Sequence, residues 1–84
     1  MRSNTRSIQI LGRSPALGKA IKRCRVERDM LASELAKLLG RNATFINQVE
    51  SAEIAIDTQT LEDCAAAFDI SVVELLEMAI SSPG

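Results

Sequence analysis

The sequence predicts an all-α domain of five short helices, on three observations. Apolar residues recur at helical spacing in five segments, and no segment is predicted as a strand. Gly40 separates two of these segments, and glycine ends a helix at low cost because it tolerates positive φ. Good N-cap chemistry precedes three segments, at Asn42, at Asp57 and at Ser71 with Glu74. A helix, a glycine turn and a second helix form a helix-turn-helix, although any helical hairpin in a small bundle would show the same pattern.

The composition bounds the class of protein. At 84 residues the chain is expected to form one domain with a small core. Phe45 and Phe68 are the only aromatic residues, so base stacking on an aromatic platform is not expected. No apolar run approaches the roughly 18–20 residues that span a bilayer, and the N-terminus lacks the apolar core of a signal peptide. We therefore expect a cytoplasmic protein with no membrane partner.

Charge is distributed unevenly along the chain. Residues 1–41 contain all ten Lys and Arg and three acids, and residues 42–84 contain eight acids and no base. These halves have net charges of +7 and −8, which give the overall charge of −1. Such asymmetry predicts a basic face and an acidic face, or an attraction between the two halves within or between molecules.

Residues 1–15 are predicted to form a flexible basic N-terminal arm. This segment is rich in Ser, Arg and Asn, shows no helical period and ends at Pro15. Ile8, Ile10 and Leu11 form a small apolar cluster that could dock on the domain or on a partner. Three arginines could follow a phosphate backbone or a DNA minor groove: Arg2, Arg6 and Arg13. A solvated tail is the alternative.

The first helix is expected over residues 16–28, with Leu17 and Ile21 facing inward. Its basic residues face outward: Lys19, Lys22 and Arg23. Val26 is apolar at a position that the period assigns to solvent. Cys24 and the distant Cys64 lie on apolar helix faces, so both are predicted to be reduced core thiols, with a redox switch as the alternative. The chain has no His and no pair of nearby cysteines, so the usual zinc sites are not expected.

A second helix is expected between Met30 and Gly40. Its apolar residues are taken as one buried face: Leu35, Ala36, Leu38 and Leu39. Leu31 is a poor N-cap, so Asp29 is expected to cap the first amides.

A third helix is expected over residues 43–51, with an inward face of Phe45, Ile46 and Val49. Ile54 and Ile56 follow in a segment predicted as an extended loop. At least one of them should enter the core, and Ile56 could belong to the core instead of to a contact surface. The fourth helix carries this inward stripe: Leu61, Cys64, Ala65 and Phe68. The fifth helix packs Leu75, Leu76 and Met78. The predicted domain plan is an arm over residues 1–15, a helix-turn-helix domain over 16–80 and a tail over 81–84.

Four stretches of this sequence resemble the XRE family of lambda-repressor-like helix-turn-helix domains. They are LGKAIKRCRVERDM, ELAKLLG, TFINQVE and TLEDCAAAFDISVVELL, which together cover about residues 17–76. The resemblance implies a small bacterial or phage-type transcription regulator. It also implies an ion pair between Arg25 and Glu50 that ties the first helix to the third.

The resemblance further implies that the third helix enters the DNA major groove. The positions that would then face bases or phosphates are Arg41, Asn42, Ala43, Thr44, Asn47 and Gln48. Asn47 and Gln48 have amide side chains suited to adenine, and Arg41 would contact a phosphate.

The sequence departs from the family at the expected phosphate contacts. Leu31 and Ala32 replace the Ser-Gln that often begins the second helix of family members, and Ser51 and Ala52 replace a basic residue and a glycine. The third helix has no Lys or Arg. Because phosphate neutralisation supplies much of DNA affinity, these changes predict weak DNA binding.

Two functions therefore compete. The preferred one is an antiactivator that sequesters a transcription activator through this patch: Lys22, Arg23, Val26, Leu31, Ala32, Ala43, Ile54 and Ile56. Here the apolar residues would be buried by the partner and the two bases would steer an acidic partner. The alternative is a DNA-binding repressor that recognises its operator as a homodimer. An enzyme, a metal or a cofactor is not expected, because the chain has no His, metal motif or Gly-rich phosphate loop.

Overall fold

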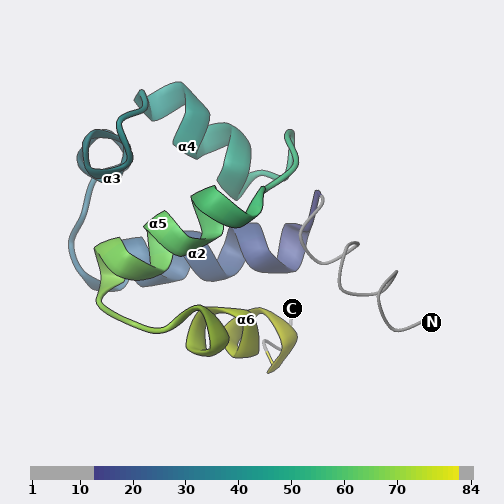
Figure 1. Ribbon diagram of the computed structural model, residues 1–84. Coiled ribbons are helices and arrows are strands. Elements are labelled where there is room, and N and C mark those ends of the chain that lie inside the picture. The colour runs from purple at the N-terminus through teal and green to yellow at the C-terminus, as the bar shows by residue number, and fades with distance from the viewer. Residues whose placement is uncertain (1–12, 82–84) are drawn as a thin grey trace.

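The computed structural model describes residues 13–81 and contains five α-helices and no strand within that range, which confirms the all-α prediction. The helices are α2 (Pro15–Glu27), α3 (Ala32–Leu39), α4 (Ala43–Glu50), α5 (Thr58–Phe68) and α6 (Val72–Ser81). In Figure 1, α2 and α5 run through the middle, α3 and α4 lie above them, and α6 lies below. None of the described helices is long and apolar enough to cross a membrane. Most of the predicted arm and the last three residues lie outside the described residues.

Helix α2 begins one residue earlier than expected. The Ser14 hydroxyl oxygen accepts a 3.1 Å hydrogen bond from the Leu17 amide and caps the helix. Pro15 is the first helical residue, where its fixed φ suits the helix and its missing N–H leaves no donor unsatisfied. Pro15 therefore starts the helix, whereas the sequence analysis had placed it at the end of the arm.

The turn between α3 and α4 has the predicted chemistry. Gly40 adopts φ 70° and ends α3, and the Arg41 amide donates a 2.8 Å hydrogen bond back to the Ala36 carbonyl. Asn42 is extended, and its Oδ1 accepts a 2.9 Å hydrogen bond from the Phe45 amide. The glycine and the N-cap together set α4 off from α3 over three residues, which gives the helix-turn-helix.

The last two helices also begin at the predicted caps. Asp57 Oδ1 accepts a 2.8 Å hydrogen bond from the Thr60 amide at the start of α5. Ser71 and Glu74 form the capping box of α6, in which each side chain accepts from the other residue's amide, at 3.0 and 2.8 Å.

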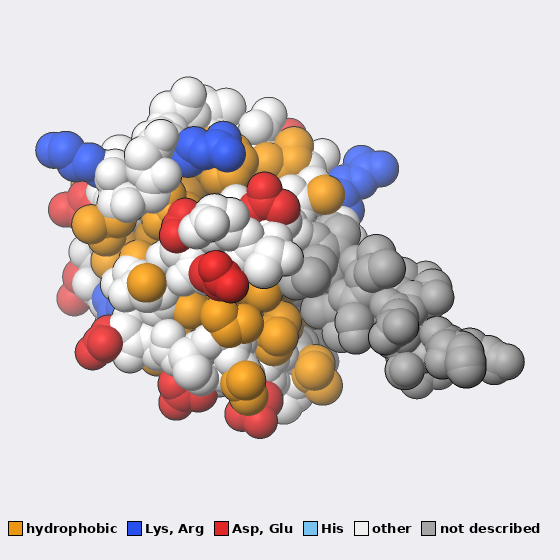
Figure 2. All heavy atoms as spheres, viewed as in Figure 1, with side chains coloured by type: hydrophobic (Ala, Val, Ile, Leu, Met, Phe, Trp, Pro, Cys, Tyr) orange, Lys and Arg blue, Asp and Glu red, His pale blue; other side chains and the backbone are white. Residues whose placement is uncertain are grey.

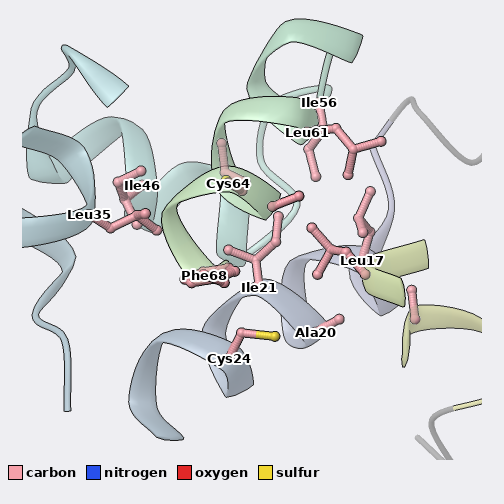
Figure 3. Packing of buried hydrophobic residues seen from close by; sticks show 14 of the residues in the cluster. Leu17, Ala20, Ile21, Cys24, Leu35, Ile46, Ile56, Leu61, Cys64 and Phe68 are labelled. Atoms are coloured by element: carbon pink, nitrogen blue, oxygen red, sulfur yellow. The ribbon is translucent and has the colours of Figure 1, made fainter. Parts of the chain in front are cut away.

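One apolar core joins all five helices, and Figure 3 shows its packing around α2 and α5. Both cysteines are buried in it as free thiols, and Cys24 Sγ lies 3.5 Å from Met78 Sδ. Arg28 holds the end of α5 against α2, since its guanidinium donates to the Phe68 carbonyl at 3.2 Å and lies 5.4 Å from the Phe68 ring centroid. The positive charge of Arg28 also interacts favourably with the negative, C-terminal end of the α5 dipole.

Two apolar residues lie where the sequence analysis did not place them. Leu38 was assigned to the buried face of the second helix but is 64% exposed. Leu35, Ala36 and Leu39 centre the inward face of α3, and Leu38 lies about 100° around the helix from that centre. Ile56 was assigned to the partner patch with the core as its alternative, and the core is correct: it is 1% exposed, and Figure 3 places it beside Leu61.

Candidate functional site

An ion pair fixes the position of α4 against α2. Arg25 Nε and one terminal nitrogen donate to the two Glu50 carboxylate oxygens at 2.7 and 2.9 Å. The other terminal nitrogen donates to the Met30 carbonyl at 2.8 Å, so the same side chain also holds the α2–α3 turn. The side chains are 12% and 6% exposed, and the hydrogen bonds with Glu50 raise the pKa of Arg25. Arg25 therefore orients both helices of the helix-turn-helix on α2.

The outer face of α4 is polar. Thr44 and Asn47 are exposed and Gln48 is half-buried, and their spacing places all three on one side of the helix. Asn42 precedes α4, where its Oδ1 accepts a hydrogen bond from the Phe45 amide and its amide nitrogen can donate to a ligand. Ala43 is half-buried and contributes an apolar edge.

Arg41, the expected phosphate contact, lies in mixed surroundings. Its guanidinium carbon lies 4.1 Å from the Phe45 ring centroid, which is a cation–π contact. Both residues line a cavity of about 210 Å³ whose wall also contains Asp57 and Asp63. Hydrogen bonds from Thr60 lower the pKa of Asp57, and the positive charge of Arg41 lowers it further. Arg41 therefore already faces negative charge from its own chain.

The start of α3 is closed by a carboxylate. Glu34 Oε1 accepts a 2.7 Å hydrogen bond from the Leu31 amide, and Leu31 has no side-chain acceptor of its own. The expectation that Asp29 caps this helix was wrong. Asp29 instead occupies a left-handed position with φ 53° in the preceding turn, where its amide donates to the Val26 carbonyl. Glu34 thus places a negative charge at the start of α3.

A second carboxylate lies beyond the end of α4. The Ser51 hydroxyl oxygen lies 2.9 Å from the Asn47 carbonyl oxygen and 2.9 Å from Glu53 Oε2, and the hydroxyl can donate to one of them at a time. Glu53 is exposed. It adds a negative charge next to the polar face of α4, which opposes the approach of DNA.

The exposed apolar residues near α3 form what we call the α3 surface: Val26, Leu31 and Leu38. They are 54%, 64% and 64% exposed. Leu38 lies in the last turn of α3, whereas Leu31 is the extended residue immediately before its first turn, so the two leucines mark opposite ends of the helix. Val26 lies in the last turn of α2, just before the turn that leads to Leu31. Sequence reasoning identified two of these residues and missed Leu38.

Leu38 also lines two adjoining hollows of the surface. One, of about 450 Å³, includes Met30 and Lys37 and reaches the α2–α3 turn. The other, of about 260 Å³, includes Ala66 and Ala67 of α5. A partner side chain placed against Leu38 would therefore contact three elements of the fold.

The remaining residues of the predicted partner patch are spread over the fold. Lys22 and Arg23 are exposed on α2, as expected, and Ala32 is half-buried beside Leu31. Ile54 is half-buried and packs against the core beyond the other end of α4. Ile56 is excluded from any contact surface by its burial.

The comparisons agree with this geometry. A family profile described as helix-turn-helix matches residues 21–75. The ImmF control region 10 kDa protein of Bacillus phage phi105 is 30% identical over 70 residues, which cover 81% of this chain and 78% of that protein.

Solved regulators share the fold. The clp gene regulator ClgR of Corynebacterium glutamicum superposes with a TM-score of 0.77 at 24% identity, over 80% of this chain and 71% of ClgR. Bacillus thuringiensis PlcR, solved in complex with the peptide PapR7 and DNA, superposes with a TM-score of 0.71 at 24% identity. That match covers 83% of this chain but only 25% of PlcR. With a helix-turn-helix profile over most of its folded part and a phage control-region relative, the chain belongs to the XRE family of helix-turn-helix transcription regulators.

Proposed function

We propose that this regulator acts in the cytoplasm by protein–protein contact, as an antiactivator that binds a transcription activator through the α3 surface. The observation that carries the proposal is the exposure of two large apolar side chains, Leu31 and Leu38, both 64% exposed, at the two ends of α3. Burying one such side chain is worth roughly 1.5–3 kcal/mol, or about one to two decades in affinity. Contiguous exposed apolar side chains of this kind mark contact sites for proteins.

The electrostatics of the helix-turn-helix support the same proposal. The three positions nearest the expected phosphate path each carry or face negative charge: Glu34 at the start of α3, Glu53 after α4, and Arg41 beside Asp57. Helix α4 has no Lys or Arg. Since cations neutralise phosphates, α4 itself adds little to the phosphate-backbone term of DNA affinity.

Residues beside the α3 surface extend the contact with the partner. Ala32 is half-buried and small, so it lets a partner approach the start of α3 closely. Lys22 and Arg23 are exposed on α2 and steer an acidic partner toward the surface. Ala43, half-buried at the start of α4, forms the outer limit of the contact, whereas Ile54 lies beyond the other end of α4 and is outside it.

Sequence-specific DNA binding, by a homodimeric repressor, is the second candidate. The exposed polar face of α4 favours it, because Asn47 and Gln48 have the donor and acceptor pair that reads adenine. In this alternative Thr44 contacts a phosphate or a thymine methyl, and Asn42 and Arg41 contact phosphates. The fold shared with part of PlcR, which was solved in complex with a peptide and DNA, supports this alternative.

One experiment separates the two functions. Regulation of a reporter promoter is measured for the wild type, for Leu31→Ser with Leu38→Ser, and for Asn47→Ala with Gln48→Ala. The proposal expects the leucine variant to lose regulation and capture of the activator while keeping its melting temperature. Val73→Ser, a 61% exposed apolar residue of α6, is the matched control and should regulate normally.

The opposite pattern would establish the repressor. If the α4 variant loses regulation and a nanomolar operator complex at physiological salt, while the leucine variant keeps both, the α3 surface is not the functional contact.

A further inference from the structure

Helix α6 has an exposed apolar flank, made of Val73, Leu76 and Ile80, which we call the α6 flank. Val73 and Ile80 are 61% and 71% exposed, and Leu76 is half-buried. Residues spaced by three and four lie on one side of a helix, so the three side chains form a continuous stripe. Helix α6 is anchored to the core by a different set of residues, chiefly Leu75 and Ala79. The described fold therefore leaves apolar surface of α6 uncovered.

The charged side chains that α6 itself contributes beside the flank are acidic. Glu74 and Glu77 are the only charged residues of α6, and no Lys or Arg follows Arg41 in the chain. In Figure 2 the lower part of the molecule shows apolar and acidic side chains, whereas Lys and Arg appear higher up and at the sides. A segment that covers this flank should accordingly be apolar and basic.

The segment that precedes α2 has this chemistry. It contains Ile8, Ile10 and Leu11, together with Arg6, and the first acidic residue of the chain is Glu27. The other segment outside the described residues, 82–84, is Ser-Pro-Gly and has no comparable side chain.

The tether between this segment and α6 is short. Helix α2 starts at Pro15 and packs directly against α6. In Figure 1 the start of α2 and the C-terminal end of α6 lie on the same side of the molecule. The six residues from Arg13 back to Ile8 are joined by five Cα–Cα steps and span up to about 17 Å when extended, and the ten residues of α6 are about 15 Å long. The segment can therefore run along the whole flank.

We propose that residues 6–11 fold back onto the α6 flank of the same molecule. An extended chain places residues two apart on one side, so Ile8 and Ile10 both face α6. Ile10, which is nearer to the tether, covers Ile80, and Ile8 covers Leu76. Arg6 then lies beside the acidic residues that border the flank.

A double-mutant cycle tests this contact in the full-length chain. Ile10→Ser and Ile80→Ser should each lower the melting temperature by about 4 °C. The two effects should not add, because either change alone removes the contact. Leu38→Ser, a change at a similarly exposed Leu on α3, is the control and should show full additivity with Ile10→Ser. Additive effects of Ile10→Ser and Ile80→Ser would overturn the proposal.

Two further measurements complete the test. Amide relaxation by NMR should give residues 8–11 the same order as α6 in the wild type and lower order in Ile80→Ser. Low order in the wild type would overturn the proposal. Sedimentation across a hundredfold concentration range should show that the protein is a monomer at the concentrations where residues 8–11 are ordered. If ordering of residues 8–11 appears only as a dimer forms, the flank is covered by a second copy and the intramolecular proposal is wrong.

Discussion

Gly18 of α2 lies directly against the backbone carbonyl of Glu50 at the end of α4. A Cβ atom at position 18 would lie 2.5 Å from the Glu50 carbonyl oxygen and 2.8 Å from that of Val49. The Glu50 side chain meanwhile pairs with Arg25 farther along α2. Glu50 therefore joins α4 to α2 through both its backbone and its carboxylate.

Gly18→Ala should destabilise the fold by about 1–3 kcal/mol, the usual cost of overpacking. At a solvent-exposed position inside a helix the same change would stabilise the protein by up to about 1 kcal/mol. The sign of the effect therefore shows whether α2 and α4 approach each other closely at Gly18. Chemical denaturation measures it, and Lys19→Ala, at the next and exposed position, is the control. A more stable Gly18→Ala variant would show that the two helices are farther apart.

Arg25→Ala should destabilise the fold by roughly 3–5 kcal/mol. The loss would strand the Glu50 carboxylate, which is 6% exposed, and leave the Met30 carbonyl without its donor. Lys22→Ala, which removes an exposed charge from the same helix, should change stability by less than about 0.5 kcal/mol. Equal melting temperatures for the two variants would contradict the importance of the pair.

Ala52→Gly should stabilise the chain. Ala52 has φ 63° and closes the end of α4, where its amide donates to the Val49 carbonyl. A left-handed position costs a residue with a Cβ about 1–2 kcal/mol, and glycine removes that cost. Glycine also gives the unfolded chain more conformational freedom, which offsets part of the stabilisation. The expected net gain is about 0.5–1 kcal/mol by denaturant unfolding. Ala55→Gly, at a loop position without positive φ, should not stabilise.

The two thiols should react slowly in the native protein. Burial raises the pKa of Cys64 to about 12 and raises that of Cys24 above its ordinary value. Since the thiolate is the reactive form, labelling at pH 8 should be slow natively and fast in denaturant. Fast native labelling of both thiols would contradict the burial.

The same shift predicts an alkaline loss of stability. The folded-state pKa of Cys64 lies above the unfolded value near 9, so its contribution is fully present below that pH and is lost as pH rises toward about 12. The variant Cys64→Ala should show a flatter stability profile over that range, whatever its absolute stability.

Local chemistry made much of the fold predictable. A positive-φ glycine at Gly40 and the acceptor side chains of Asn42, Asp57 and Ser71 act within three residues of themselves, and each ends or begins a helix as expected. The cap of α3 was harder to predict, because Leu31 itself has no acceptor and Glu34 supplies it from three residues later.

The surface was harder to predict than the caps. Leu38 was assigned to the core because adjacent leucines were grouped together, whereas α3 buries only the arc centred between Leu35 and Leu39. A wheel drawn at 100° per residue would have separated them. Ile54 and Ile56 lie in a loop, where no period decides which one is buried, and only tertiary packing makes Ile56 part of the core.

The ion pair between Arg25 and Glu50 also couples the local unfolding of α3 to that of α4. The two residues are 25 positions apart, and both helices of the helix-turn-helix lie between them. Neither α3 nor α4 can detach far while both anchors hold, so the motif should open as one cooperative unit. Amide hydrogen exchange in α3 and α4 should therefore show a single opening free energy, which falls for both helices together when Arg25 is removed.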